Sequence, residues 1–292
     1  MTIMFERDSE QAEWMQHPVG GGAATRRIVL GIVLVLTALF LVAPLLLIVT
    51  SGLSSGLSVF FRNLTEPATV HAISLTLLTA LIVVPINILF GLAAAWTVTK
   101  FDFRGKTLLI ALIELPYSIS PIVAGVAYLF VYGSQGLFGP LLEYLDIKVM
   151  FALPAIFLAS LFVTAPFVAR ELIPLMQVQG TDEEEAAVTL GAGGFTTFWR
   201  VTLPNVKWAV VYGAILCNAR VMGEFGAVSV VSGNIRGQTT TLPLQIELLY
   251  QDYNVVGAFA AATVLTAVAL VTILIKVTLE RYGKTSGAAP GH

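Results

Sequence analysis

Two charged residues stand four positions apart in a stretch that is otherwise uncharged. Arg220 and Glu224 lie within residues 208–232. On a helix this spacing places both side chains on one face, where they can pair. A charge in the middle of a bilayer costs about 2.5–3.5 kcal/mol, so such residues face the helix bundle or a water-filled cavity. Two interpretations stay open: an ion pair that only locks helix packing, or an Arg220 that Glu224 holds in place so that its charge can face an anion.

Other reactive constellations do not appear in the sequence. Cys217 stands alone, which excludes an intrachain disulfide and a thiolate metal cluster. The three histidines, His17, His71 and His292, lack any ligand spacing, and no H-E-x-x-H motif occurs. We therefore predict neither a metal site nor an intramembrane enzyme.

A nucleotide site is also not expected. A P-loop requires G-x-x-x-x-G-K-[ST]. Gly105-Lys106-Thr107 matches the end of this motif, but Lys100 occupies the place of the first glycine. Gly283-Lys284-Thr285 fails in the same way, with Thr278 at that place. The chain is predicted to bind no ATP or other cofactor by itself.

The elements that carry these residues are predicted to be membrane helices. Of the 292 residues 57% are hydrophobic and only 12% are charged, far from the balance of a soluble domain. About 20 apolar residues span a bilayer as a helix. Six stretches qualify: residues 28–50, 67–99, 107–132, 149–169, 208–232 and 253–275. We predict an all-α integral membrane protein with an N-terminal tail (1–27), a six-helix transmembrane domain (28–280) and a C-terminal tail (281–292).

The distribution of positive charge predicts the orientation. Six spans put both termini on one side, and ten Lys and Arg residues fall on that side against three on the other. The first set is Arg26, Arg27, Lys100, Arg104, Lys106, Arg170, Arg200, Lys207, Arg281 and Lys284, and the second is Arg62, Lys148 and Arg236. Because cytoplasmic loops are enriched in Lys and Arg, both termini are expected in the cytoplasm.

The longest interior loop, residues 171–207, is patterned. Thr181 followed by Glu184 predicts a capping box at the start of a short helix, which Gly191 would end in the left-handed conformation. A second helix is expected to start at Thr196 or Thr197 and to run to Leu203, where Pro204 closes it and opens the next span. The sequence thus indicates a short helix with small side chains, presented to the cytoplasm between two spans.

This loop resembles the E-A-A motif of ABC importer permeases. Glu185-Ala186-Ala187-x3-Gly191-x9-Val201-x-Leu203-Pro204 matches E-A-A-x3-G-x9-I-x-L-P at every spacing, with Val201 where the family prefers Ile. The resemblance implies that the loop couples the chain to a separate ATPase subunit, which binds ATP and Mg. The candidate coupling residues are Glu185, Ala186, Ala187, Gly191, Leu203 and Pro204.

Nearly the whole chain, except residues 1–25 and the last ten, is similar to the W-type permeases of sulfate and thiosulfate importers. The similarity is carried by residues 115–125, 219–233, 235–237, 239–244 with their Thr-Thr-Thr-Leu-Pro-Leu run, and 247–250. The A-R-x-x-G-E-F-G core is shared with molybdate permeases, so a molybdate, tungstate or other oxyanion importer is the alternative. The resemblance implies a bacterial inner-membrane assembly with a T-type homologous permease, two ABC ATPase copies and a periplasmic sulfate-binding protein. Lipid surrounds such a subunit, and no nucleic acid is involved.

Other transporter classes fit less well. A secondary transporter would show two similar halves with interrupted helices at matching places, and the sequence has no such symmetry. A channel needs no rigid inner docking loop. Pro85, Pro116 and Pro121 are expected to kink spans or free backbone carbonyls, and Glu114 is interpreted as a partner for a neighbouring helix.

Overall fold

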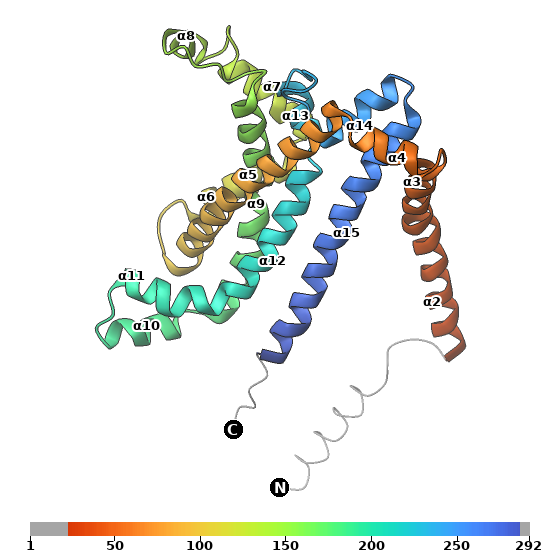
Figure 1. Ribbon diagram of the computed structural model, residues 1–292. Coiled ribbons are helices and arrows are strands. Elements are labelled where there is room, and N and C mark those ends of the chain that lie inside the picture. Colours follow the sequence, from red (N-terminus) through yellow and green to blue (C-terminus); the bar gives the residue numbers. More distant parts are fainter. Residues whose placement is uncertain (1–22, 287–292) are drawn as a thin grey trace. The chain divides into compact units, whose positions relative to one another are not determined.

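The computed structural model describes residues 23–286, and all the regular structure in that range is helical (Figure 1). The elements before the middle of the chain are α2 (Ala23–Thr37), η1 (Ala38–Val42), α3 (Ala43–Leu53), α4 (Leu57–Leu64), α5 (Pro67–Lys100), α6 (Lys106–Ser118), α7 (Pro121–Tyr132) and α8 (Gly139–Tyr144). The remaining elements are α9 (Leu153–Gln179), α10 (Asp182–Thr189), α11 (Gly194–Thr197), η2 (Phe198–Thr202), α12 (Leu203–Met222), α13 (Gly226–Val231), α14 (Leu242–Gln251) and α15 (Val255–Ser286). The all-α prediction is confirmed.

The chain divides into two compact units at Thr50. The described part of the first unit is an apolar helical run in which α2 passes through the π-helical turn η1 into α3. Nearly all of its described side chains are exposed, as suits a helix that contacts lipid. The second unit begins at Ser51 and holds every predicted site residue.

The number of spans differs from the prediction. Four of the described helical runs are long and apolar enough to cross a membrane: Thr25–Leu53, Pro67–Lys100, Leu153–Gln179 and Val255–Leu279. A fifth is possible if α6 and α7 form one span, but these two helices meet at an angle of 108°. The stretch 208–232 is divided between α12 and α13. The count of six therefore remains a prediction.

Both breaks have a local cause. Between α6 and α7, Ile119 and Ser120 are extended (ψ 138° and 133°), because a residue that precedes proline, as Ser120 precedes Pro121, disfavours the helical conformation. Pro85 and Pro116, by contrast, lie inside continuous helices. Between α12 and α13, Gly223 ends the first helix and a carboxylate caps the second. The bend before Pro121 agrees with the expectation that prolines kink the spans, whereas the sequence analysis did not predict the break between α12 and α13.

The core of the second unit is built by α5, α9 and α12, with buried side chains of all three in one cluster. A β-carbon built on Gly91 of α5 would lie 2.6 Å from Cβ of Val168, and one on Gly213 of α12 would lie 3.2 Å from its Cα. Small residues at both contacts let the two helices approach α9 closely, as is usual where lipid gives no hydrophobic drive for association.

A buried polar contact links the same three helices. The side-chain amide of Asn87 in α5 donates to the hydroxyl of Thr164 in α9 at 2.6 Å, and lies 3.6 Å from the sulfur of Cys217 in α12. Thr164 in turn donates to the carbonyl of Ser160 at 2.6 Å. These groups find partners inside the protein, which is what a buried polar group in a membrane requires.

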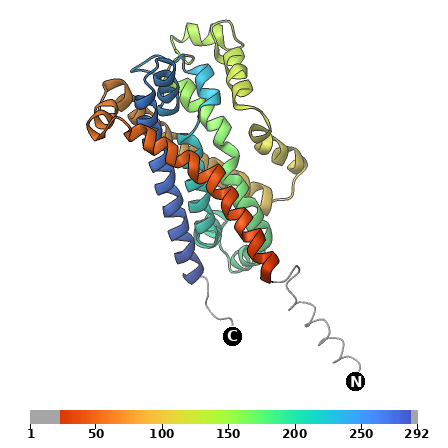
Figure 2. The same cartoon turned by 90° about the vertical axis from the view of Figure 1, so that its right-hand side faces the viewer.

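The second unit has two ends of different character. The α10–α11 segment lies at the lower end of α9 and α12, and the C-terminal end of α15 lies at that end too, whereas α8, α13 and α14 lie at the upper end (Figures 1 and 2). The helix α15 continues to Ser286, six residues past the predicted boundary at 280. Residues 281–286 contain no proline, and their single glycine, Gly283, does not end the helix. Residues 23–27 of the predicted N-terminal tail are helical, and residues 1–22 and 287–292 of the two tails lie outside the described residues.

Close packing of α5 on α9 yields a prediction. Gly91→Ala should lower the stability of the folded protein by about 1–3 kcal/mol, because the added methyl group overlaps Val168 unless the two helices move apart. Thermal unfolding in detergent micelles measures this change. Gly31→Ala is the matched control, since nothing lies within 4 Å of a β-carbon at Gly31; equal melting temperatures for both variants would contradict the close approach.

Candidate coupling segment and ion pair

The helix α10 starts as the sequence predicts but is capped differently. Thr181 is the N-cap residue, and the first turn holds Asp182, Glu183, Glu184 and Glu185, which suit the positive end of the helix dipole. The Thr181 hydroxyl donates to the Glu185 carboxylate at 2.7 Å and makes no hydrogen bond to the backbone. The predicted capping box of Thr181 with Glu184 was wrong, because Glu184 turns toward other partners.

Those partners are Lys100 at the end of α5 and Thr202 at the end of η2. The ammonium of Lys100, the last residue of α5, lies 2.8 Å from the Glu184 carboxylate. The hydroxyl of Thr202 donates to the same carboxylate at 3.0 Å. Burial raises the pKa of Glu184, but hydrogen bonds from Lys100, from the backbone and from Thr202 outweigh it and hold that pKa below its ordinary value of 4.5. Glu184 is therefore a charged side chain that faces inward.

A second, more exposed set of contacts ties α10 to the start of α12. The amide of Asn205 donates to the Glu183 carboxylate. The amide of Gln179, at the end of α9, donates to the backbone carbonyl of Asn205 at 3.4 Å. A small cavity lies among these residues and Lys100. The predicted coupling segment, residues 181–204, is thus attached to the C-terminal ends of α5 and α9 and to the N-terminal end of α12.

The end of α10 has the predicted geometry. Gly191 adopts φ of +89°, and its N–H donates to the carbonyl of Val188 at 2.9 Å. The next N–H, from Ala192, donates to Ala187 at 3.0 Å. These bonds close the last turn, and the left-handed conformation that they require favours glycine. The prediction of a left-handed Gly191 is confirmed.

The second half of the segment differs from the prediction. Helical structure begins at Gly194, passes through η2 and continues without a break into α12. Pro204 lies in the first turn of α12, as expected for a residue that opens the next helix, but it does not close a preceding one. Proline has no N–H to donate to the preceding turn, and the wider π-helical turn η2 leaves room for its ring. The predicted loop 171–207 is shorter as well, because α9 extends to Gln179.

The predicted coupling residues fall into exposed and half-buried groups. Glu185, Ala186, Gly191 and Pro204 are exposed, while Ala187 and Leu203 are half-buried. Two large apolar side chains beside them are also exposed, Leu190 to 89% and Phe195 to 78%. An apolar surface of this kind, rimmed by charges, is typical of a protein interface.

The other candidate pair is formed as predicted. The Arg220 guanidinium lies 2.7 Å from Oε2 of Glu224. The other oxygen, Oε1, accepts the backbone N–H of Ala227 at 3.1 Å, and so caps the first turn of α13. Glu224 is only 2% exposed, whereas the Arg220 side chain is 33% exposed. The carboxylate therefore has a structural task, and the cation has one accessible side.

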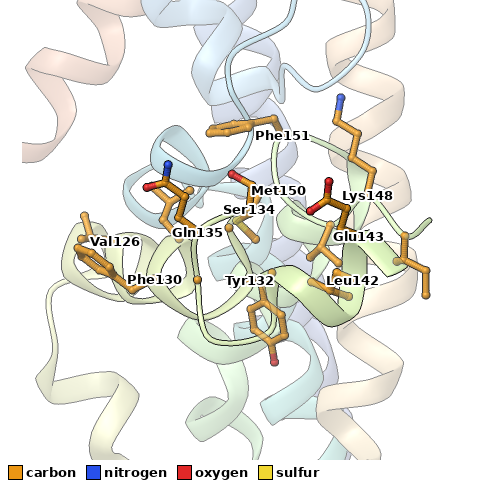
Figure 3. Close-up of a pocket in the computed structure, with 16 residues that line it drawn as sticks. Val126, Phe130, Tyr132, Ser134, Gln135, Leu142, Glu143, Lys148, Met150 and Phe151 are labelled. Atoms are coloured by element: carbon orange, nitrogen blue, oxygen red, sulfur yellow. The ribbon is translucent and has the colours of Figure 1, made fainter. Parts of the chain in front are cut away.

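A larger cavity opens at the opposite end from α10, with a volume of about 780 Å³. Side chains of α7, α8 and the neighbouring loops line it, and Glu143 and Lys148 are the charged ones (Figure 3). None of the predicted site residues is part of this lining.

Two features escaped the sequence analysis. Arg170 was placed in the interior loop, but it lies inside α9, with its guanidinium carbon 4.5 Å from the centre of the Tyr117 ring. The uncharged run ended at Ala169, although the helix continues for ten residues. The pairing of Lys100 with Glu184 joins positions 84 apart and left no signal in a local pattern. Glu114, interpreted as an interhelical partner, is exposed on α6.

Comparison with known proteins identifies relatives over most of the chain. The family model "Binding-protein-dependent transport system inner membrane component" matches residues 87–282. The chain is 51% identical over 251 residues to the sulfate transport system permease protein CysW of Escherichia coli (strain K12), covering 86% of each protein. It is 36% identical to CysT of the same strain, covering 87% of this chain and 92% of that one.

A solved structure shows the same fold. The bacterial alginate ABC transporter, in complex with an alginate pentasaccharide-bound periplasmic protein, contains a chain that matches with a TM-score of 0.74 at 17% identity. The match covers 88% of this chain and 94% of that chain. With the family model spanning more than half of the sequence, the chain belongs to the binding-protein-dependent transport system inner membrane components, the permease subunits of ABC importers.

Proposed function

We propose that this chain is the transmembrane subunit of an ATP-driven importer that moves sulfate, and with it thiosulfate, into the cytoplasm. The observation that carries the proposal is the identity of 50–51% to CysW proteins of Escherichia coli and Synechococcus elongatus, spread over 86–90% of their length. A chloroplastic sulfate permease 2 of Chlamydomonas reinhardtii adds 45% identity over 87% of this chain. Molybdate and tungstate are the alternative substrates, because molybdate permeases resemble this chain in the A-R-x-x-G-E-F-G core.

Competition uptake distinguishes these substrates. Membrane vesicles that contain the complete importer and its binding protein should accumulate labelled sulfate. A tenfold excess of thiosulfate should reduce that uptake strongly and molybdate should not, because a site built for one anion discriminates by the contacts that the other cannot make. Molybdate that is transported faster than sulfate would assign the chain to the alternative class.

The proposed assembly has four kinds of subunit. A T-type permease is the expected membrane partner, since CysT proteins are related to this chain. The family description and the alginate transporter structure support a periplasmic binding protein. Two ATPase copies would bind ATP and Mg, and this chain would have no nucleotide site. The excess of Lys and Arg on one side supports cytoplasmic termini, and places the α10 end of the second unit toward the ATPases.

The coupling segment of residues 181–204 is the proposed docking element. The same segment also exposes Glu185, Ala186 and the apolar side chains of Leu190 and Phe195. Small side chains allow a partner surface to approach closely, and the apolar ones supply area to bury. The inward contacts of Glu183 and Glu184 keep this surface fixed against the membrane helices.

Valine at Gly191 tests the docking role. Gly191→Val forces a β-branched residue to φ of +89°, a strain of about 1–3 kcal/mol. We expect normal insertion into the membrane, with reduced co-purification of the ATPase and uptake lowered by about tenfold or more. The matched control is Gly193→Val, because Gly193 has a φ of −72° and open space around its β-carbon. Wild-type ATPase binding and uptake by Gly191→Val would refute the docking role.

The translocation path is proposed to pass Arg220. Sulfate must exchange its hydration for fixed donors that bind it weakly. Glu224 is committed to α13, so it orients Arg220 without covering its accessible side. The positive charge of that exposed guanidinium face can then offset the charge of the dianion.

A charge-neutralising series tests this assignment. Arg220→Gln alone leaves Glu224 buried without its cation, and a cost of several kcal/mol is expected. Glu224→Gln keeps an oxygen for the Ala227 N–H, so α13 should stay capped. The double variant leaves neither charge alone, and we expect it to fold but to transport sulfate poorly. Wild-type uptake by a well-folded double variant would show that the pair only locks helix packing.

A further inference from the structure

A buried ion pair holds the coupling segment from the side opposite to its docking surface. The Lys100 ammonium and the Glu184 carboxylate lie 2.8 Å apart, and their side chains are only 7% and 17% exposed. Glu184 precedes the E-A-A residues and points inward, whereas Glu185 is exposed. The pair is therefore distinct from the residues proposed to meet the ATPase.

Lys100 connects α5 with α10 and with the turn between α9 and α10. It is the last residue of α5, and its ammonium also donates to the carbonyl of Gly180, between α9 and α10. Glu184 accepts a further hydrogen bond from Thr202 of η2. Because both charges are largely withdrawn from water, each depends on the other and on these neutral donors. A displacement of α10 relative to Lys100 would break the ion pair with Glu184.

The helix α5 leads from this point to the other end of the unit. It continues without interruption for 34 residues. Near its other end the Thr76 hydroxyl accepts the backbone N–H of Leu242, the first residue of α14, at 2.8 Å. At 1.5 Å per residue, Thr76 lies about 36 Å along the helix from Lys100. One continuous helix thus connects the coupling segment with α14.

The exposed contacts of α10 lead elsewhere. Glu183 is bound by Asn205, so this link reaches α12 and not α5. Both of its side chains are exposed, and an exposed contact transmits less force because water replaces it at little cost. Lys100 and Glu184 form the buried link.

We propose that Lys100 and Glu184 are positioning residues that transmit the movement of α10 to α5, so that ATP hydrolysis is converted into opening of the path. This rests on the proposed docking of the coupling segment to an ATPase. It adds that docking alone is not sufficient: without the buried pair, the ATPase would bind and hydrolyse ATP while transport fails.

The test is made with the complete importer in proteoliposomes that contain ATP, with the binding protein and labelled sulfate on the outside. The variant Lys100→Met/Glu184→Met removes the link and leaves no charge unpaired, so it should fold. We expect ATPase co-purification within about twofold of wild type, continued ATP hydrolysis, and sulfate uptake per ATP lowered by about tenfold or more, with partial recovery in Lys100→Glu/Glu184→Lys, which restores an ion pair.

The neighbouring pair of Lys106 and Asp102 supplies the matched control. These residues lie two and six positions from Lys100, but their ion pair of 3.2 Å is exposed, with the Asp102 side chain fully accessible. Lys106→Met/Asp102→Met should leave uptake per ATP unchanged.

Each remaining outcome overturns the proposal. Uptake per ATP within twofold of wild type in Lys100→Met/Glu184→Met would show that the pair transmits nothing. Loss of ATPase binding in that variant would show that the pair only shapes the docking surface, and would leave the docking role standing. Wild-type protein that binds no ATPase at all would instead refute the proposed function. If the double-methionine variant does not reach the membrane, the exchange variant decides, since uptake per ATP below a tenth of wild type in a folded exchange variant also contradicts the pairing.

Discussion

Lipid offers no hydrogen-bond partner to a backbone amide, so a helix in this protein can break only where other groups satisfy its ends. The breaks within the second unit obey this constraint. At the start of α13 the Glu224 carboxylate accepts the N–H of Ala227. At the start of α7, Pro121 occupies the first helical position, where the missing N–H would have had no partner anyway. The two breaks face each other, because a β-carbon at Gly226 would lie 2.9 Å from Cβ of Pro121.

The continuous helices supply the rigidity that these breaks lack. Close contacts of Gly91 and Gly213 with Val168 hold α5, α9 and α12 together, and Asn87 adds a buried hydrogen bond between two of them. A tightly packed core resists gradual deformation. The movement proposed for the coupling segment would therefore be carried along these helices toward their far end, where the short helices α13 and α14 lie.

The sequence allowed the class of the protein and much of the coupling segment to be predicted, because those features depend on local chemistry. Apolar length predicts helices in lipid, and the position of Gly191 predicts a left-handed helix end. The errors concern contacts between distant residues. Glu184 was assigned to a capping box because Thr181 is three residues away. Its carboxylate instead pairs with Lys100 and accepts a hydrogen bond from Thr202. Arg170 ended a predicted span because a charge is costly in lipid, yet the ring of Tyr117 supplies a favourable surface for its guanidinium.

The two ion pairs differ in which partner is buried, and this difference indicates different tasks. In the Lys100–Glu184 pair both side chains are largely buried, and neutral donors and acceptors of the protein complete their surroundings. Such a pair has little capacity left for a ligand, which suits the positioning role proposed for it. In the Arg220–Glu224 pair the carboxylate is buried and capped to a backbone, while a third of the cation is accessible. Only the second arrangement leaves donors for an anion, and it does so on the helix that ends where the span breaks. About 26 Å of α12 separate Arg220 from Leu203, so the proposed ATPase contact and the proposed anion contact lie toward opposite ends of the same core.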